Sequence, residues 1–116
     1  MNAKKEFIEH IDSRSILCAQ IQHGDTYGYD EVVVYNLTTG WTNEDWNKFL
    51  NEIDFDYDSG YGGQNLFGTI WYVDGTWSTR GEYDGSEWWE HQKRPDIPTE
   101  LNRVDKVRDK KINQIL

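Results

Sequence analysis

Cysteine, proline and long apolar runs are all scarce in this chain of 116 residues. Its single cysteine, Cys18, cannot form an internal disulfide, which favours a reducing compartment. No apolar run approaches the length needed to cross a bilayer, and the N-terminus enters an amphipathic pattern rather than a signal peptide. These absences predict a cytoplasmic protein without a membrane anchor.

Basic residues are also few, and they are unevenly placed within a net charge of -9. Residues 24–66 hold nine acidic residues against Lys48 alone, whereas residues 93–116 hold seven basic residues against four acidic ones. Direct binding to DNA, RNA or an anionic membrane requires a positive surface, so the acidic block argues against these ligands. It fits a protein that avoids nucleic acid or imitates it.

The hydrophobic pattern predicts one α+β domain in residues 1–94, followed by a basic C-terminal helix or tail in residues 95–116. The best-defined element is the second helix, because Thr42 is a suitable cap and apolar residues follow it at helical spacing. Trp41 and Trp46 occupy the two positions of a hydrophobic staple around that cap. The expected order is a helix over 3–12, strands over 15–22 and 31–37, an amphipathic helix over 42–53, and a three-stranded antiparallel meander over 66–91.

Two Asp-Gly pairs set the expected register of the meander. Asp74-Gly75 and Asp84-Gly85 both favour two-residue turns with positive φ. Such turns would pair Val73 with Thr76 and Tyr83 with Ser86. The core face would then carry Leu66, Ile70, Tyr72, Trp77, Tyr83 and Trp88, with Trp88 over the Gly68–Gly81 pair, and the other face would carry Phe67, Trp71, Val73, Arg80, Glu82, Glu87 and Trp89.

The stretch DFDYDSGYGG, residues 54–63, places aspartates at three alternate positions. A calcium-binding EF-hand loop begins in this way, but it needs glycine where this chain has Ser59 and a bidentate glutamate where it has Asn65. In an extended chain the three carboxylates would lie on one side at ~6–7 Å spacing, similar to phosphates along a nucleic-acid strand. The alternatives are a row that imitates a nucleic-acid backbone and a solvated connection anchored by Phe55 and Tyr57.

Catalysis finds little support in the residues. The three histidines are far apart and lack metal-spaced neighbours, and no serine or cysteine sits in a nucleophile motif, so we expect neither an enzyme nor a cofactor. Glu82 and Glu87 should face each other across the second turn, with Arg80 relieving their repulsion. Trp71, Arg80 and Trp89 could form an exposed platform for a sugar or small ligand, or a second core layer.

The string LFGTIWYVDGTWSTRGEYDGSEWWEH, residues 66–91, resembles small acidic proteins of phages and prophages, and the likeness extends over about residues 54–92. That resemblance implies an inhibitor of host defence, such as an anti-CRISPR protein that occupies a nucleic-acid groove.

The sequence therefore predicts a non-enzymatic inhibitor that blocks the basic groove of a host nucleic-acid-binding protein by charge mimicry, without binding nucleic acid or membrane itself. The alternative is a small-ligand or carbohydrate module on the Trp/Arg platform. The expected partner-binding residues are Asp30, Glu31, Glu44, Asp45, Asp54, Asp56 and Asp58 for charge, and Tyr57, Tyr61, Trp71, Arg80 and Trp89 as anchors.

Overall fold

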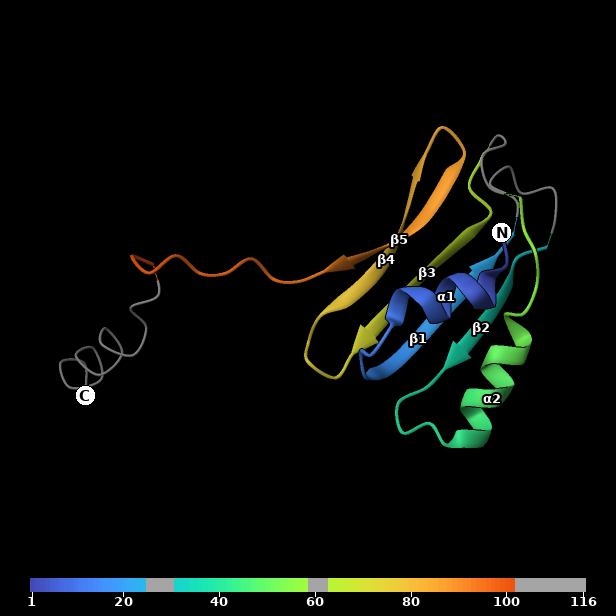
Figure 1. Cartoon of the computed structure of the whole chain (residues 1–116), viewed down its shortest axis with the longest axis horizontal. Coiled ribbons are helices and arrows are strands. Elements are labelled where there is room, and N and C mark those ends of the chain that lie inside the picture. Colours follow the sequence, from blue (N-terminus) through green and yellow to red (C-terminus); the bar gives the residue numbers. More distant parts are fainter. Residues whose placement is uncertain (25–30, 59–62, 102–116) are drawn as a thin grey trace.

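A computed structural model describes residues 1–24, 31–58 and 63–101 of the chain, which form two helices and a five-stranded antiparallel sheet (Figure 1). The fold class is therefore α+β, as expected. The strand order is β2-β1-β3-β4-β5, so the whole sheet is not a simple meander. Asp30, Tyr61 and residues 102–116 of the expected tail lie outside the described residues. The elements are α1 (Ala3–Ile11), β1 (Ile16–His23), β2 (Val33–Leu37), α2 (Asn43–Glu52), β3 (Leu66–Tyr72), β4 (Trp77–Tyr83) and β5 (Ser86–Gln92).

The start of α2 is built as its sequence predicts. The Thr42 side chain accepts a hydrogen bond from the backbone N–H of Asp45, at 3.2 Å, and the Asp45 carboxylate accepts one from the Thr42 N–H, at 2.9 Å. This capping box satisfies two backbone donors that a helix N-terminus otherwise leaves free. The rings of Trp41 and Trp46 lie 5.3 Å apart across it, which confirms the hydrophobic staple.

Both helices cover the same face of the sheet (Figure 1). Phe7 of α1 is fully buried, and its ring lies 5.5 Å from that of Phe49 in α2 and 6.4 Å from that of Trp89 in β5. Aromatic pairs in tilted and edge arrangements of this kind add to the free energy of burial. The core therefore lies between one face of the sheet and the two helices, and no helix of residues 1–24, 31–58 and 63–101 lies over the opposite face.

The two Asp-Gly turns differ, and the expected register of the first hairpin is wrong. Asp84 and Gly85 both have positive φ, 52° and 84°, and Tyr83 pairs with Ser86 as expected. In the first hairpin only Gly75 has positive φ, its N–H donates to the Tyr72 carbonyl, and the Tyr72 N–H donates to the Thr76 carbonyl. This is a three-residue loop, one residue longer than the loop the sequence suggested.

That extra loop residue turns β4 and β5 over relative to β3, because side chains alternate between faces. Ile70 pairs with Ser78 rather than Thr79, and Trp71 pairs with Trp77. Leu66, Ile70 and Tyr72 point into the core, as expected. The residues that change sides are Trp77, Tyr83 and Trp88, which leave the core face, and Arg80, Glu82, Glu87 and Trp89, which join it.

The glycines of β3 and β4 lie under two different tryptophans. A Cβ at Gly81 would lie 2.6 Å from the indole of Trp88, which covers this glycine on the face without helices. A Cβ at Gly68 would lie 2.6 Å from the Gln20 carbonyl oxygen and 3.1 Å from the ring of Trp89 on the core side. The expected cover of both glycines by Trp88 is therefore correct for Gly81 only.

Beyond β5, residues 93–101 are exposed and lead away from the sheet (Figure 1). Within the part of the chain that the structure describes, no helix is long and apolar enough to span a membrane.

Candidate functional site

A buried charged cluster lies between α1 and the core face of the sheet. The Arg80 side chain is 1% exposed, and its Nη1 lies 3.0 Å from Glu6 Oε1, while Nη2 lies 3.4 Å from Glu87 Oε1. Nη2 also donates to the Tyr57 hydroxyl at 2.8 Å, and that hydroxyl donates to Glu6 Oε1 at 2.6 Å. One arginine thus holds α1, residue 57 and the β4–β5 hairpin together.

Glu87 ties the same cluster to the start of β3. Its two carboxylate oxygens accept hydrogen bonds from the backbone N–H groups of Asn65, at 2.8 Å, and Leu66, at 2.9 Å. The Glu87 side chain is fully buried, so these two bonds and the Arg80 guanidinium replace the water that the carboxylate loses. Removal of Arg80 would leave the buried Glu87 carboxylate without the guanidinium that compensates its charge.

The geometry of the cluster indicates a structural role. Arg80 lies with its guanidinium carbon 5.0 Å from the centre of the Trp89 ring, and Nη1 faces Glu6 without the alignment of a hydrogen bond. Burial and the hydrogen bond to Glu6 raise the pKa of Tyr57 well above its usual value, although the Arg80 charge opposes the shift. A neutral phenol between two charged partners links them and does not act as a base.

Three expected anchors are therefore placed differently from the sequence prediction. Tyr57, Arg80 and Trp89 are buried, so they cannot contact a partner from this position. Trp71 is 43% exposed, but it lies on the opposite face of the sheet from Arg80 and Trp89. The Trp71–Arg80–Trp89 platform does not exist, because the register of β4 differs by one residue from the expected one. The expected pairing of Glu82 with Glu87 is present, with Glu82 exposed.

The row of three aspartates alternates as the sequence predicts. Asp54, Asp56 and Asp58 are exposed, whereas Phe55 is half-buried and Tyr57 is buried. The side-chain amide of Asn2 donates to Asp54 at 3.1 Å and to Asp56 at 3.2 Å. In the described parts of the chain, the only basic side chain within 4.0 Å of these carboxylates is Lys4, at that distance from Asp54. An exposed pair at this distance adds little to stability and neutralises little of the row.

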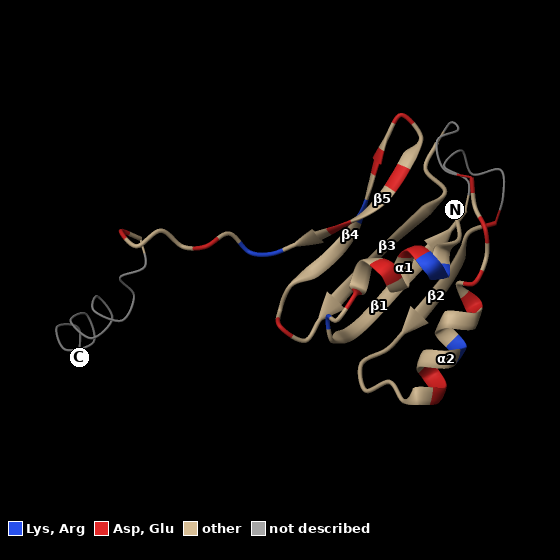
Figure 2. Ribbon diagram, viewed as in Figure 1, with Lys and Arg blue, Asp and Glu red and all other residues tan. Residues whose placement is uncertain are grey.

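The row continues the acidic surface of α2. Glu44, Asp45 and Glu52 are exposed on the helix, and Glu31 is exposed before β2. Figure 2 shows acidic positions at both ends of α2 and along the segment that follows it, with a single basic position, Lys48, on the helix. We call the carboxylates of α2 and residues 54–58 the acidic strip. It extends over roughly 30 Å, from ten helical residues and five extended ones.

A serine–histidine contact that the sequence did not suggest lies under α1. Nε2 of His10 is 2.7 Å from Ser78 Oγ, which is also 2.7 Å from the Tyr72 hydroxyl. Burial, with smaller effects of the positive charges of Arg14, His91 and Arg80, lowers the pKa of His10 below its usual value. Ser78 is completely buried, so no substrate reaches its oxygen in this structure. The contact joins helix and sheet.

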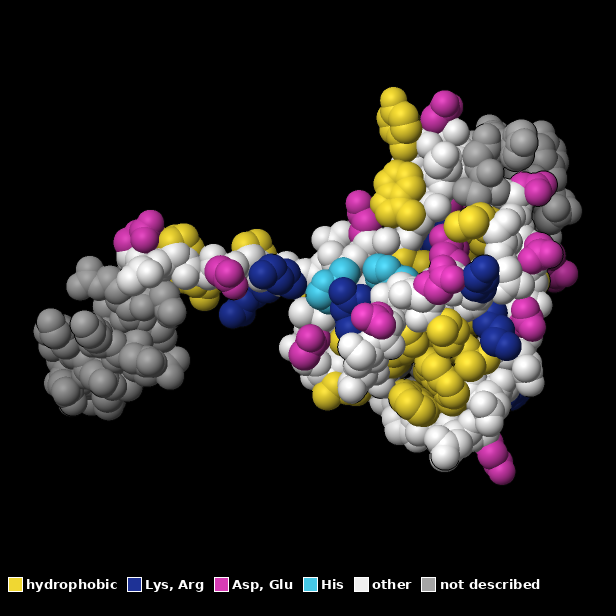
Figure 3. Space-filling view, viewed as in Figure 1, with side chains coloured by type: hydrophobic (Ala, Val, Ile, Leu, Met, Phe, Trp, Pro, Cys, Tyr) yellow, Lys and Arg dark blue, Asp and Glu magenta, His cyan; other side chains and the backbone are white. Residues whose placement is uncertain are grey.

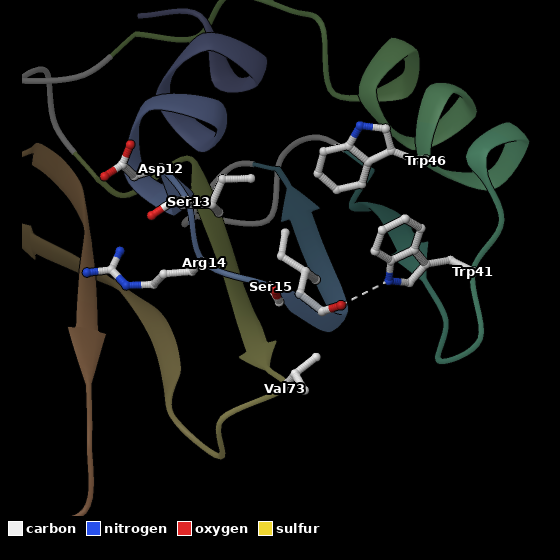
Figure 4. A pocket seen from close by; sticks show the side chains of 9 residues that line it. Asp12, Ser13, Arg14, Ser15, Trp41, Trp46 and Val73 are labelled. Atoms are coloured by element: carbon white, nitrogen blue, oxygen red, sulfur yellow. Dashed lines mark hydrogen bonds between the residues drawn. The ribbon is translucent and has the colours of Figure 1, made fainter.

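A groove of about 510 Å³ lies beside the C-terminal end of α1 (Figure 4). Trp41 and Trp46 form one side, and Trp41 Nε1 donates to the Ile16 carbonyl at 3.1 Å. In Figure 4 the charged ends of Arg14 and Asp12 point away from the tryptophans. The groove therefore offers aromatic surface but no charged group that converges on it.

Hydrophobic side chains gather between α1 and α2 on one side of the molecule (Figure 3), and aromatic side chains gather on the face of the sheet without helices. Phe67, Trp71, Trp77 and Trp88 project from it, with Trp71 and Trp88 at least one-third exposed. We call it the uncovered face. The sequence predicted an aromatic outer face but assigned it Trp89 in place of Trp77 and Trp88.

No group of three or more metal-ligating side chains is present within residues 1–24, 31–58 and 63–101. The expected calcium alternative involves Ser59, which lies outside these ranges. In comparisons with known proteins, no family model, no curated protein and no solved structure matches this chain.

Proposed function

We propose that this protein is a non-enzymatic inhibitor whose acidic strip occupies the basic groove of a nucleic-acid-binding partner. The observation that supports the proposal is the exposure of Asp54, Asp56 and Asp58 in one row, with Lys4 as the only basic side chain within 4.0 Å of them among the described residues. Carboxylates with so little positive charge beside them in the described part of the chain attract a positively charged surface, and they raise the rate of encounter with it.

The resemblance of residues 54–92 to small acidic phage proteins extends this proposal to the partner's identity. A host defence protein, and a CRISPR effector in particular, contains the kind of groove that charge mimicry would block. Glu31, Glu44 and Asp45 would add charge, and Asp30 and Tyr61 remain proposed contacts outside the described residues. Tyr57, Arg80 and Trp89 are removed from the proposed contacts because they are buried.

The alternative function, a sugar or small-ligand site on Trp71, Arg80 and Trp89, has lost its geometric basis. These side chains lie on opposite faces of the sheet. No single ligand of that size could contact all of them.

The test compares two variants that remove the same amount of charge. The first replaces Asp54, Asp56 and Asp58 with asparagine, which still accepts hydrogen bonds from Asn2. The control replaces three exposed acids elsewhere, as Glu90→Gln, Asp96→Asn and Glu100→Gln. Partners are captured from host lysate and from purified CRISPR effectors at low and moderate salt.

The first variant should bind about tenfold more weakly, since three exposed charges at roughly 0.5 kcal/mol each amount to about 1.4 kcal/mol. Its binding should also depend less on salt, and the partner's own nucleic acid should displace the wild type. Equal binding by wild type and the first variant, or equal loss in both variants, would refute charge mimicry by the strip.

A further inference from the structure

The uncovered face is neutral in an otherwise strongly acidic molecule. Side chains alternate along each strand, and the registers of the five strands define which of them point outward. Among these outward positions Glu90 is the only charged one. Most of the net charge of -9 therefore lies elsewhere, on the helices, the loops and the acidic strip.

The surface shape of this face follows from the register of its strands. Trp71 pairs with Trp77, which forms one aromatic ridge across β3 and β4. Thr69 pairs with Thr79 and forms a row of two small side chains beside it, which Gln20 of β1 and Glu90 of β5 continue on either side. Beyond that row, Trp88 lies over Gly81 as part of a second ridge. A low row between two ridges about 13 Å apart can receive a ridge from a second surface of the same shape.

We propose that two copies of this chain associate through their uncovered faces. Two acidic proteins repel each other over most of their surfaces, and the uncovered face is where they can meet with the fewest like charges opposed. Its relief is self-complementary, as a two-fold interface requires. Two sheets joined in this way would pack about 10 Å apart, with each pair of helices on the outside.

The size of the face is adequate for such a dimer. Five strands at ~4.8 Å spacing and ~7 residues of ~3.3 Å rise outline roughly 500 Å² of flat sheet. Projecting tryptophans raise the accessible area towards the ~800 Å² per partner of a standard interface. Polar side chains, including Gln20, Gln22 and Asn36, lie on the same face beside the aromatic ridges, so the apolar part of the face is smaller than its outline.

The inference is independent of the proposed function, and salt separates the two. Dimerisation through a neutral face should strengthen or stay constant as salt rises, because salt screens the repulsion between two acidic chains. Binding by the acidic strip should weaken under the same change. One process can therefore fail while the other is observed.

Sedimentation equilibrium of the full chain over about 1–100 µM tests the proposal, since this range spans the Kd expected of an interface of modest size. The Thr79→Lys variant places a long side chain between the two ridges, and because Glu90 is its cross-strand neighbour, the bulk of the lysine rather than a net charge opposes the second copy. The Thr39→Lys variant introduces the same side chain into the exposed loop after β2. We expect wild type and Thr39→Lys to dimerise, and Thr79→Lys to dimerise at least roughly tenfold more weakly.

Three results would overturn the proposal. The first is a wild type that stays monomeric throughout this range, and the second is a dimer that Thr79→Lys leaves intact, which would place the interface elsewhere, for example at the β2 edge. The third is a monomer whose tryptophan emission responds to a panel of sugars, which would make a glycan the occupant of the face. Circular dichroism of both lysine variants verifies that each is folded.

Discussion

The face of the sheet beneath α1 and α2 contains a buried arginine and a buried carboxylate, whereas the face without helices presents three tryptophans and one charge. Antiparallel sheets usually carry apolar side chains on the covered face and polar ones in water, a rule that Leu66, Ile70 and Tyr72 follow here and from which the charged cluster and the outer tryptophans depart. In this protein the covered face accommodates charge because each charged group has several partners at short distance. The uncovered face has aromatic groups without a cover.

The difference shows that buried polar groups and apolar side chains have separate roles in this small domain. Residue 57, β3 and the β4–β5 hairpin need a common attachment point under α1, and Arg80 reaches all of them with one side chain. Apolar side chains could fill that volume but would not satisfy the backbone N–H groups of Asn65 and Leu66. The aromatic groups of the uncovered face satisfy no such groups; Trp88 covers Gly81, and the proposed dimer would bury the exposed parts of the others.

The largest effect should follow from Arg80→Ala, which removes the centre of the covered face. Glu87 would remain buried without its cation, so we expect a loss of about 4 kcal/mol in the free energy of unfolding. Glu82→Gln is the control, since Glu82 lies on the same strand with its side chain exposed and the glutamine oxygen can still accept the hydrogen bond of the Gly85 N–H, and it should cost below about 0.5 kcal/mol. Urea unfolding followed by circular dichroism measures both. Similar losses in the two variants would show that the cluster does not stabilise the fold.

A smaller effect on the free energy of unfolding should distinguish the adjacent residues Trp88 and Trp89, whose side chains point to opposite faces of the sheet. Trp89 is 7% exposed in the core, so Trp89→Ala should cost about 3 kcal/mol. Trp88 is 36% exposed and contacts Gly81, so Trp88→Ala should cost about 1 kcal/mol when the protein is dilute. The same unfolding experiment gives both values. A loss for Trp88→Ala as large as that for Trp89→Ala would mean that the uncovered face is buried in solution.

The sequence was sufficient to predict the elements whose signals are local. The cap, staple and length of α2 depend on residues within about a dozen positions, and the alternation of residues 54–58 depends on five. Which side chains of β4 and β5 face the core depends on the length of the first turn. The dipeptide Asp74-Gly75 alone did not determine that length. Asp74 has no positive φ, and its carboxylate accepts hydrogen bonds from the N–H and hydroxyl of Thr76, which supports the longer loop.

The buried cluster could not be predicted because its members come from four separate parts of the chain. Glu6, Tyr57, Arg80 and Glu87 meet only when α1 lies on the sheet. The sequence contained one signal, because Arg80 was expected on the same face as the Glu82–Glu87 pair, where its charge would relieve their repulsion. The sequence did not show on which face of the sheet these residues would lie, because that depends on the length of the first turn.

The smallest expected effect is a pH dependence that originates under α1, on the covered face. Burial, Arg14, His91 and Arg80 lower the pKa of His10 in the folded chain below its usual 6.5, so the unfolded chain binds the proton more readily as the pH falls through this value. Stability should therefore be complete above about pH 6.5 and decrease below it. His23, whose pKa is also lowered by burial although Glu87 opposes the shift, should add a second contribution of the same sign.

Unfolding free energies at about pH 7.5 and pH 5.5 measure this dependence. His10→Gln keeps a side chain that can hydrogen-bond to Ser78 but does not titrate, so its stability should fall less between the two pH values than that of the wild type. His23→Gln should retain the contribution of His10. If His10→Gln loses as much stability on acidification as the wild type, His10 is protonated as readily in the folded chain as in the unfolded one. The contact with Ser78 would then not depend on a neutral imidazole, and the loss of stability on acidification would originate in other groups.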